Sequence, residues 1–268
     1  FAGANITNDV RFGFNLGEEV RRKLLGFWNI YVFFNTYASI EGKKCIKKVA
    51  DADLDATDRW LNARVKQFVS KAKAAFEGYW AQNVIAEFER CVDDISNWYI
   101  RINRKRFWQS GDSANKLAAY SSLYDAIKKL VIVMAPIIPF MTEFIWQNLI
   151  RQFEEEAEVS VHFNEFVELE ELLPEEEKLL LDTEFVRKII NLALKIRNEN
   201  QLKVKQPLKC LSVVLPQGKM QAVTLAEAII KDELNVKKLE LLQDDSSLQM
   251  EFLTVNFKEA GNVLKSRV

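Results

Sequence analysis

The sequence predicts a mainly α-helical protein: an antiparallel helical bundle followed by a small α+β module. Gly and Pro, which weaken helices, number only 9 and 5 in a 268-residue chain that is rich in Leu, Ala, Lys and Glu. Apolar residues recur at helical spacing up to residue 152. After an acidic stretch, residues 153–177, short alternating apolar runs typical of strands enter the pattern. The change divides the chain into two parts.

The first expected helix covers residues 18–37 and follows an irregular connection, residues 1–17. One apolar face carries Val20, Leu24, Phe27, Tyr31 and Phe34. A second apolar group lies off that face and consists of Leu25, Trp28, Val32 and Phe33. A helix that is apolar nearly all round is typically buried on several sides. Because the chain begins on Phe, we expect it to be a piece of a longer protein, so that Leu25, Val32 and Phe33 face solvent where a domain is missing.

The next two helices each present one apolar face to a shared core. Asp55 or Thr57 is expected to cap the second helix, which ends near Gly78. Its apolar face consists of Trp60, Leu61, Val65, Phe68, Val69, Ala72 and Phe76. The third helix is expected over residues 82–108, before a turn at residues 110–112. Its apolar face consists of Val84, Phe88, Cys91, Ile95, Trp98 and Ile102.

Two further helices complete the expected bundle, residues 18–152. The fourth directs Leu117, Tyr120, Tyr124, Ile127, Leu130, Val131 and Met134 inward. Pro136 and Pro139 end it, and the fifth helix begins with Pro139 in its first turn. The residues that this fifth helix is expected to bury are Phe140, Phe144, Ile145 and Leu149. Long helices on short links form antiparallel neighbours.

An acidic linker, residues 153–177, leads to the second part, residues 178–268. Glutamates make this linker acidic, among them Glu154, Glu155, Glu156, Glu158, Glu168, Glu170, Glu171, Glu175, Glu176 and Glu177. The second part is expected to contain helices at 182–200 and 223–231 and strands at 208–215, 236–242 and 248–255. One more helical start at Val263 suggests that this α+β module is truncated.

The third helix carries the candidate functional surface on its polar side. At about 100° per residue, Asn97, Arg101, Arg104, Lys105 and Trp108 share one arc. Cationic groups beside an amide and an indole suit a polyanion with stackable bases. The simpler interpretation is a solvated helix face, which the spacing alone leaves open. On the other side, Trp98 and Tyr99 are expected in the core, and Arg106 is expected to point toward the apolar face.

Composition narrows the classes of function. The net charge of −1 limits any nucleic-acid contact to a local patch. Cys45, Cys91 and Cys210 are scattered without metal-ligand spacing, which indicates reduced thiols in the cytoplasm. His162 has no partner at ligand spacing and is expected to be structural. The longest apolar run, residues 130–140, is too short for a membrane span.

Several motifs together resemble the class I aminoacyl-tRNA synthetases, and among them the isoleucyl branch. They are Asp58-Arg59-Trp60-Leu61, Asn97-Trp98-Tyr99-Ile100-Arg101, Arg104-Lys105-Arg106-Phe107-Trp108, Met134-Ala135-Pro136, Pro139-Phe140 with Glu143, Ser160-Val161-His162, Arg197 with Lys203-Val204-Lys205-Gln206-Pro207-Leu208, Glu233-Leu234-Asn235-Val236-Lys237, and Asn256-Phe257-Lys258 with Gly261. Each motif alone is weak, but they occur in family order and cover nearly the whole chain from about Leu16.

The resemblance implies an anticodon-binding helical bundle, residues 18–152, and a junction module after the linker. Residues 1–17 would connect to a catalytic domain that this chain lacks. The implied partners are the anticodon arm of tRNA(Ile) and that catalytic domain, with no membrane and no DNA. The expected tRNA contacts are Asn97, Arg101, Arg104, Lys105 and Trp108, then Arg21, Arg22 and Lys23, and more weakly Lys203 and Lys205.

The sequence departs from the resembled family in what it lacks. The family's two nucleotide-binding signatures, of the His-x-Gly-His and Lys-Met-Ser-Lys-Ser types, are absent from this sequence, as is the family's editing insertion. We therefore expect no cofactor, no metal site and no catalysis by this chain alone, although the longer enzyme would use ATP and Mg²⁺. Two alternatives remain. The chain could be the same region of a valyl- or leucyl-tRNA synthetase, or a non-catalytic helical scaffold that binds proteins through its acidic linker and first-helix aromatics.

Overall fold

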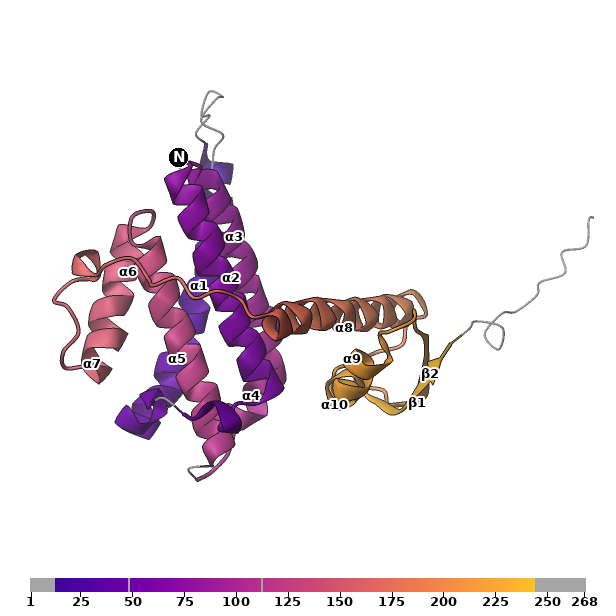
Figure 1. Cartoon of the computed structure of the whole chain (residues 1–268). Coiled ribbons are helices and arrows are strands. Elements are labelled where there is room, and N and C mark those ends of the chain that lie inside the picture. Colours follow the sequence, from indigo (N-terminus) through magenta and orange to yellow (C-terminus); the bar gives the residue numbers. More distant parts are fainter. Residues whose placement is uncertain (1–12, 48, 112, 244–268) are drawn as a thin grey trace, which may run out of the picture. The chain divides into compact units, whose positions relative to one another are not determined.

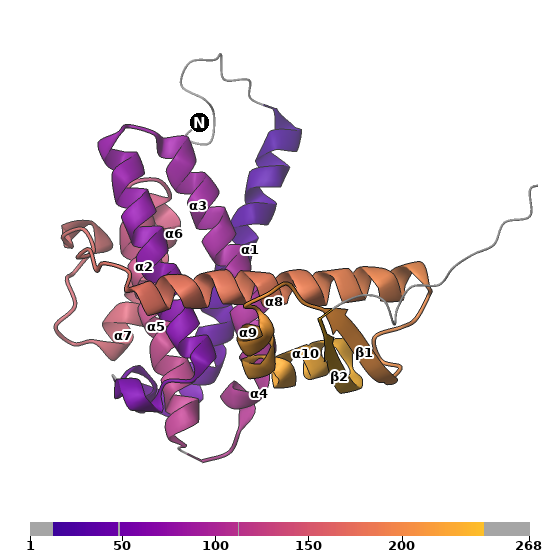
Figure 2. The ribbon, with the colours of Figure 1, turned by 45° about the vertical axis from the view of Figure 1, so that its right-hand side comes forward.

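The computed structural model describes residues 13–47, 49–111 and 113–243 (Figure 1). The chain divides into two compact units, one ending at Phe185 and the other beginning at Val186. The first unit is the helical bundle, in which α2 packs against both α3 and α5, as the two ribbon views show (Figures 1 and 2). Its principal helices are α1 (Phe14–Glu41), α2 (Ala56–Glu77), α3 (Ala81–Asp93), α4 (Arg101–Trp108), α5 (Ala114–Met134), α6 (Pro139–Ile145) and α7 (Arg151–Phe153). The predicted fold class is confirmed.

Helix α1 begins at Phe14, earlier than expected, and its first turns extend past the core. Every residue from Gly13 to Lys23 is exposed, so the prediction that Val20 belongs to the core face is wrong. Further along, Phe27, Tyr31 and Phe34 are buried as predicted. The core therefore forms only along the C-terminal two-thirds of this helix.

The second apolar group of α1 is only partly exposed. Leu25 and Val32 keep 40% and 41% of their surface in solvent, which confirms that they form an exposed patch. The prediction is wrong for Phe33, which is half-buried. Its ring packs against that of Phe107, with the two ring centres 5.1 Å apart. Trp28 is half-buried and packs against Phe144, with the two ring centres 5.3 Å apart.

Helix α2 begins with a capping box. The side chain of Asp55 accepts a hydrogen bond from the backbone N–H of Thr57 at 2.9 Å, and the carboxylate of Asp58 accepts one from the backbone N–H of Asp55 at 3.0 Å. Of the two expected caps, the structure therefore selects Asp55. Side chains that satisfy the first N–H groups of a helix in this way typically contribute about 1 kcal/mol.

The third expected helix is continuous, but it is not α-helical throughout. Between α3 and α4 the backbone forms a π-helical segment, η3 (Asp94–Ile100). A π turn contains an extra residue and rotates the side chains that follow it. Cys91, Ile95 and Trp98 are buried as predicted, whereas Ile102 is only half-buried.

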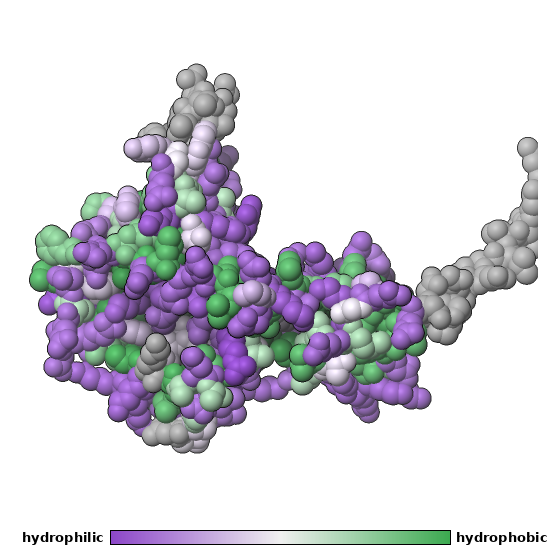
Figure 3. All heavy atoms as spheres, viewed as in Figure 1, coloured by the Kyte–Doolittle hydropathy of each residue, from purple (hydrophilic) through white to green (hydrophobic). Residues whose placement is uncertain are grey.

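The fifth expected helix starts at Pro139 as predicted, but its buried face differs. Phe140 is 91% exposed and Phe144 is 46% exposed, so the prediction that both are buried is wrong. The stripe that faces the core instead runs through α6 and the π-helical segment η4 (Trp146–Ile150) and consists of Thr142, Ile145, Trp146, Leu149 and Ile150. Phe140 lies two residues from Thr142, which places it on the opposite side of the helix. Figure 3 shows hydrophobic surface over this end of the bundle.

The acidic segment, residues 153–177, packs against the bundle and is held there by hydrogen bonds and ion pairs. Within it, η5 (Val161–Phe163) contacts α6, where Glu143 accepts hydrogen bonds from Ser160 Oγ at 2.9 Å and from the backbone N–H of Val161 at 3.0 Å. Glu170 forms ion pairs with Lys66 at 3.2 Å and Lys129 at 3.4 Å. Helix α8 (Pro174–Glu199) begins within this segment, where we expected a start at residue 182. The segment is thus part of the first unit rather than a free tether.

The second unit is a small α+β module. Strands β1 (Leu208–Val214) and β2 (Val236–Leu242) pair in parallel, with Leu208 opposite Val236. The single helix expected between them is two helices, α9 (Met220–Leu225) and α10 (Glu227–Leu234), because Ala226 leaves the helical region of the backbone. The strand expected at 248–255, the helical start at Val263 and the last motif, residues 256–261, lie outside the described residues.

Candidate nucleic-acid interface

The predicted contact residues lie on the exposed face of η3 and α4. Asn97, Arg101, Arg104, Lys105 and Trp108 are all exposed, and we call them the cationic strip. The Trp108 side chain keeps 53% of its surface in solvent, and the guanidinium carbon of Arg104 lies 5.2 Å from the centre of its ring. The structure thus places the five residues together, while their contact with RNA stays a prediction.

The opposite face of α4 is held by a buried ion pair with α2. Arg106, only 9% exposed, donates from Nη2 to Asp58 Oδ2 at 2.6 Å and from Nη1 to Asp58 Oδ1 at 2.9 Å. Burial opposes the charge on Arg106, but its hydrogen bonds with Asp58 and the charge of that carboxylate outweigh burial and raise its pKa. Bidentate pairs of this kind fix orientation as well as distance.

Polar neighbours complete the coordination of this pair. The Tyr99 hydroxyl donates to Asp58 Oδ1 at 2.7 Å, and burial together with the Asp58 charge raises the pKa of Tyr99 well above its usual value. Asn103 Oδ1 accepts from Arg106 Nη1 at 2.9 Å and from the Thr57 hydroxyl at 3.1 Å. A fully hydrogen-bonded buried network of this kind is rigid. We call Thr57, Asp58, Tyr99, Asn103 and Arg106 the anchor network.

A second buried cluster holds the start of the π segment. Arg64 of α2 donates from Nε to Asp94 at 2.7 Å and pairs through Nη1 with Glu87 at 2.9 Å. Cys91 is fully buried beside them, and burial raises the pKa of its thiol to about 12. The thiol is therefore protonated at neutral pH and poorly reactive. The π segment is held at its first turn by Asp94 and at its last by the anchor network.

Sequence reasoning found the strip and missed the anchors. It placed Arg106 toward the apolar side, but it gave no role to Asn103 and considered Thr57 only as a possible helix cap. The missing information is tertiary, because the anchor network joins residues 41 to 49 positions apart. A weak signal was present, since Asp58 and Arg106 stand in two different motifs of the resembled family.

The second-rank cations do not join the strip. Arg21 forms an ion pair with Glu18, and Lys23 pairs with Glu19 and Glu89, whose hydrogen bonds raise the pKa of Lys23. Arg21, Arg22 and Lys23 lie on the first turns of α1, whereas Trp108, the last residue of the strip, lies near the far end of α1, with its ring centre 6.3 Å from that of Tyr37. At 1.5 Å per residue, Lys23 and Tyr37 are about 21 Å apart along the helix. Lys203 and Lys205 are exposed but belong to the second unit.

The described residues contain neither a cluster that could bind a metal ion nor a helix that could cross a membrane. Across residues 13–47, 49–111 and 113–243, no group of His, Cys, Asp and Glu side chains could hold a metal ion. In the same ranges no helix has the length and apolar character needed to cross a membrane.

Comparison with known proteins identifies the family. The family described as "Anticodon-binding domain of tRNA ligase" matches residues 58–215, more than half of the chain. The chain is 33% identical over 258 residues to the isoleucine–tRNA ligase of Thermus thermophilus, covering 94% of this chain and 24% of the relative. It is 36% identical over 228 residues to the isoleucine–tRNA ligase of Dehalococcoides mccartyi, covering 84% of this chain and 22% of the relative. It thus spans about a quarter of the length of these relatives. The match across the α2–α5 core, with the cationic strip within it, shows that the chain belongs to the anticodon-binding domain family of tRNA ligases.

Proposed function

We propose that this chain binds the anticodon arm of an isoleucine tRNA as part of an isoleucine–tRNA ligase. In that role it holds the tRNA so that the acceptor end reaches a catalytic domain elsewhere in the longer protein, where ATP and Mg²⁺ are used. The family supports anticodon binding. The names of the most similar relatives support isoleucine over valine or leucine.

The observation that carries the proposal is the division of α4 into two faces. One face is fixed by the anchor network, through Arg106 and Asn103, and the other presents Arg101, Arg104 and Lys105 to solvent. A surface held by a rigid second layer loses little conformational freedom on binding. The strip is therefore preorganised for a ligand, as a flexible loop of lysines would not be.

The chemistry of the strip matches a single-stranded RNA loop. Guanidinium and ammonium groups pair with phosphates, and an exposed indole offers a flat surface on which an unpaired base can stack. The Asn97 amide, whose Nδ2 donates to Asp93 Oδ1, keeps a second N–H and its carbonyl oxygen for base edges. The alternative function, a scaffold that binds proteins through the acidic segment, is less well supported than RNA binding. Glu170 and Glu176 of that segment are already paired with Lys66 of the bundle.

A second partner of the proposed enzyme is its own catalytic domain. Two exposed apolar groups on the bundle support a domain contact: Leu25 and Val32 on α1, and Phe140 with Phe144 on α6. The ring centres of Trp28 and Phe144 are 5.3 Å apart, so α1 and α6 present these two groups beside each other. Apolar surface of this kind commonly marks an interface.

The test of RNA binding is its dependence on salt. We expect the purified chain to bind bulk tRNA with an affinity that falls steeply as NaCl increases, by about 0.7–0.9 logarithmic units per tenfold salt for each phosphate contact. Three contacts from Arg101, Arg104 and Lys105 would give a slope of about −2 to −3. Filter binding or fluorescence anisotropy across a salt series measures this slope. Undetectable tRNA binding, or binding that is insensitive to salt, would contradict the proposal and favour the protein scaffold.

A further inference from the structure

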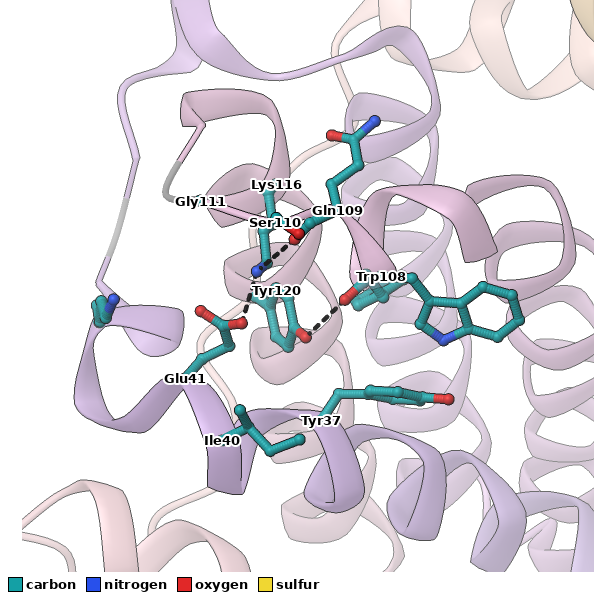
Figure 4. Close-up of a pocket in the computed structure, with 11 residues that line it drawn as sticks. Tyr37, Ile40, Glu41, Trp108, Gln109, Ser110, Gly111, Lys116 and Tyr120 are labelled. Carbon is teal, nitrogen blue, oxygen red and sulfur yellow. Dashed lines mark hydrogen bonds and ion pairs between the residues drawn. The ribbon is translucent and has the colours of Figure 1, made fainter.

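A pocket opens beside the cationic strip, where the end of α1, the end of α4 and the start of α5 meet (Figure 4). Its volume is about 630 Å³, within the range of about 300–1,000 Å³ typical of small-molecule sites. The side chains that shape it include Tyr37, Glu41, Phe107, Trp108, Lys116 and Tyr120. Trp108 is thus shared between the strip and the pocket.

One wall of the pocket carries a buried ion pair. The ammonium of Lys116, whose side chain is 4% exposed, donates to Glu41 Oε1 at 2.5 Å and to the backbone carbonyl of Gln109 at 2.8 Å. Glu41 keeps 16% of its side-chain surface in solvent, so its carboxylate is reachable from the pocket. Buried lysines are rare, and an apolar pair of similar volume commonly stabilises a fold equally well. The pair gives this wall of the pocket a carboxylate and an ammonium group.

The opposite wall is aromatic. Tyr37 and Trp108 lie on one side of the Tyr120 ring in Figure 4, with Glu41 and Lys116 on its other side; the ring centres of Tyr37 and Trp108 are 6.3 Å apart. An aromatic wall that faces a hydrogen-bonding wall is the arrangement that recognises a flat, polar-edged ring. Lys44 also lines the pocket and could pair with a phosphate, whereas the Glu41 carboxylate favours an occupant that donates hydrogen bonds, as a base edge does.

We propose that this pocket takes one unstacked nucleobase of the bound RNA and that Glu41 reads its edge. The inference rests on the proposed RNA-binding function. Carboxylates accept hydrogen bonds from exocyclic amino groups of bases. Adenine, cytosine and guanine carry such a group, whereas uracil does not. Lys116 acts as a positioning residue, since it neutralises Glu41 and fixes the oxygen that it contacts. The pocket would therefore favour an amino-bearing base over uracil, whose one edge donor, N3–H, lies between two carbonyl oxygens that the Glu41 carboxylate would repel.

The test uses RNA stem–loops whose loop bases are changed to uracil one at a time. We expect the parent chain to bind about tenfold more weakly when one particular loop position is changed, the effect of a single base-edge contact. In Glu41→Gln, Lys116 holds the amide oxygen, so an N–H donor faces the base and the penalty for uracil at that position should vanish or reverse. A melting curve of this variant shows whether it is folded under the binding conditions.

A second variant addresses the pocket without touching its ion pair. Ile40 lines the pocket and is 78% exposed, so Ile40→Trp should occupy the space without disturbing the core. We expect this variant to lose the base preference and to keep the salt slope of the parent. Leu192→Trp, at an exposed apolar position of α8 outside the pocket lining, is the matched control and should keep both.

The outcomes separate this inference from the function on which it rests. Salt-dependent RNA binding with no position at which uracil weakens it would overturn the pocket inference and leave strip binding intact. A folded Glu41→Gln or Ile40→Trp chain that keeps the parental preference would do the same. A parent chain that binds no RNA would instead overturn the proposed function itself.

Discussion

Asp58→Ala is expected to lower the free energy of unfolding by about 3–5 kcal/mol, the usual cost of removing one partner of a buried ion pair. Arg106 would remain only 9% exposed, without the carboxylate that accepts two of its hydrogen bonds. The same substitution removes the nearer of two acceptors of the Tyr99 hydroxyl, leaving the Ala119 carbonyl at 3.2 Å, and one half of the capping box at the start of α2. A single change therefore abolishes several stabilising interactions at once.

Urea or thermal denaturation followed by circular dichroism measures this destabilisation. Asp53→Ala is the matched control, because Asp53 is an exposed carboxylate on the connection before α2, and it should change stability by no more than about 0.5 kcal/mol. Equal stability of the two variants would mean that the anchor network does not hold α4 in place.

Trp98→Ala is expected to cost about 3–5 kcal/mol, the range for truncating a large buried aromatic. The Trp98 side chain is 4% exposed and continues the buried stripe of Cys91 and Ile95. Trp108→Ala is a close control, because it removes the same side chain ten residues further along the same continuous helix. Trp108 is 53% exposed, so its removal should change stability by about 0.5 kcal/mol. Similar melting temperatures for the two variants would show that the core and solvent faces of this helix are assigned wrongly.

Most of the bundle could be predicted because helical periodicity is local information. The buried residues of α2 and α5, and the caps and prolines that bound the helices, are set by neighbours within a few positions. Phe140 shows where local information fails. Its size suggested burial, but the phase of the stripe through Ile145 and Leu149 leaves it on the opposite face. The phase depends on which side α5 occupies, and a single helix does not encode that choice.

The candidate site could likewise be predicted only where the information is local. The cationic strip could be found from spacing, because its members lie three or four residues apart on one helix. The π segment could not, since contacts that hold it, such as that of Arg64 in α2 with Asp94, join residues 30 positions apart. The pair of Glu41 and Lys116 joins residues 75 positions apart, so only the folded chain reveals the pocket beside the strip.

The central claim is that one face of α4 maintains the fold while the other binds RNA. The most direct test is the doubly substituted chain Arg101→Ala with Arg104→Ala, measured for tRNA affinity over a salt series and for melting temperature. We predict weaker binding, a salt slope reduced by about 0.7–0.9 for each phosphate that the variant no longer binds, and a melting temperature close to that of the parent. A variant that binds tRNA like the parent, or that melts as early as Trp98→Ala, would contradict this claim.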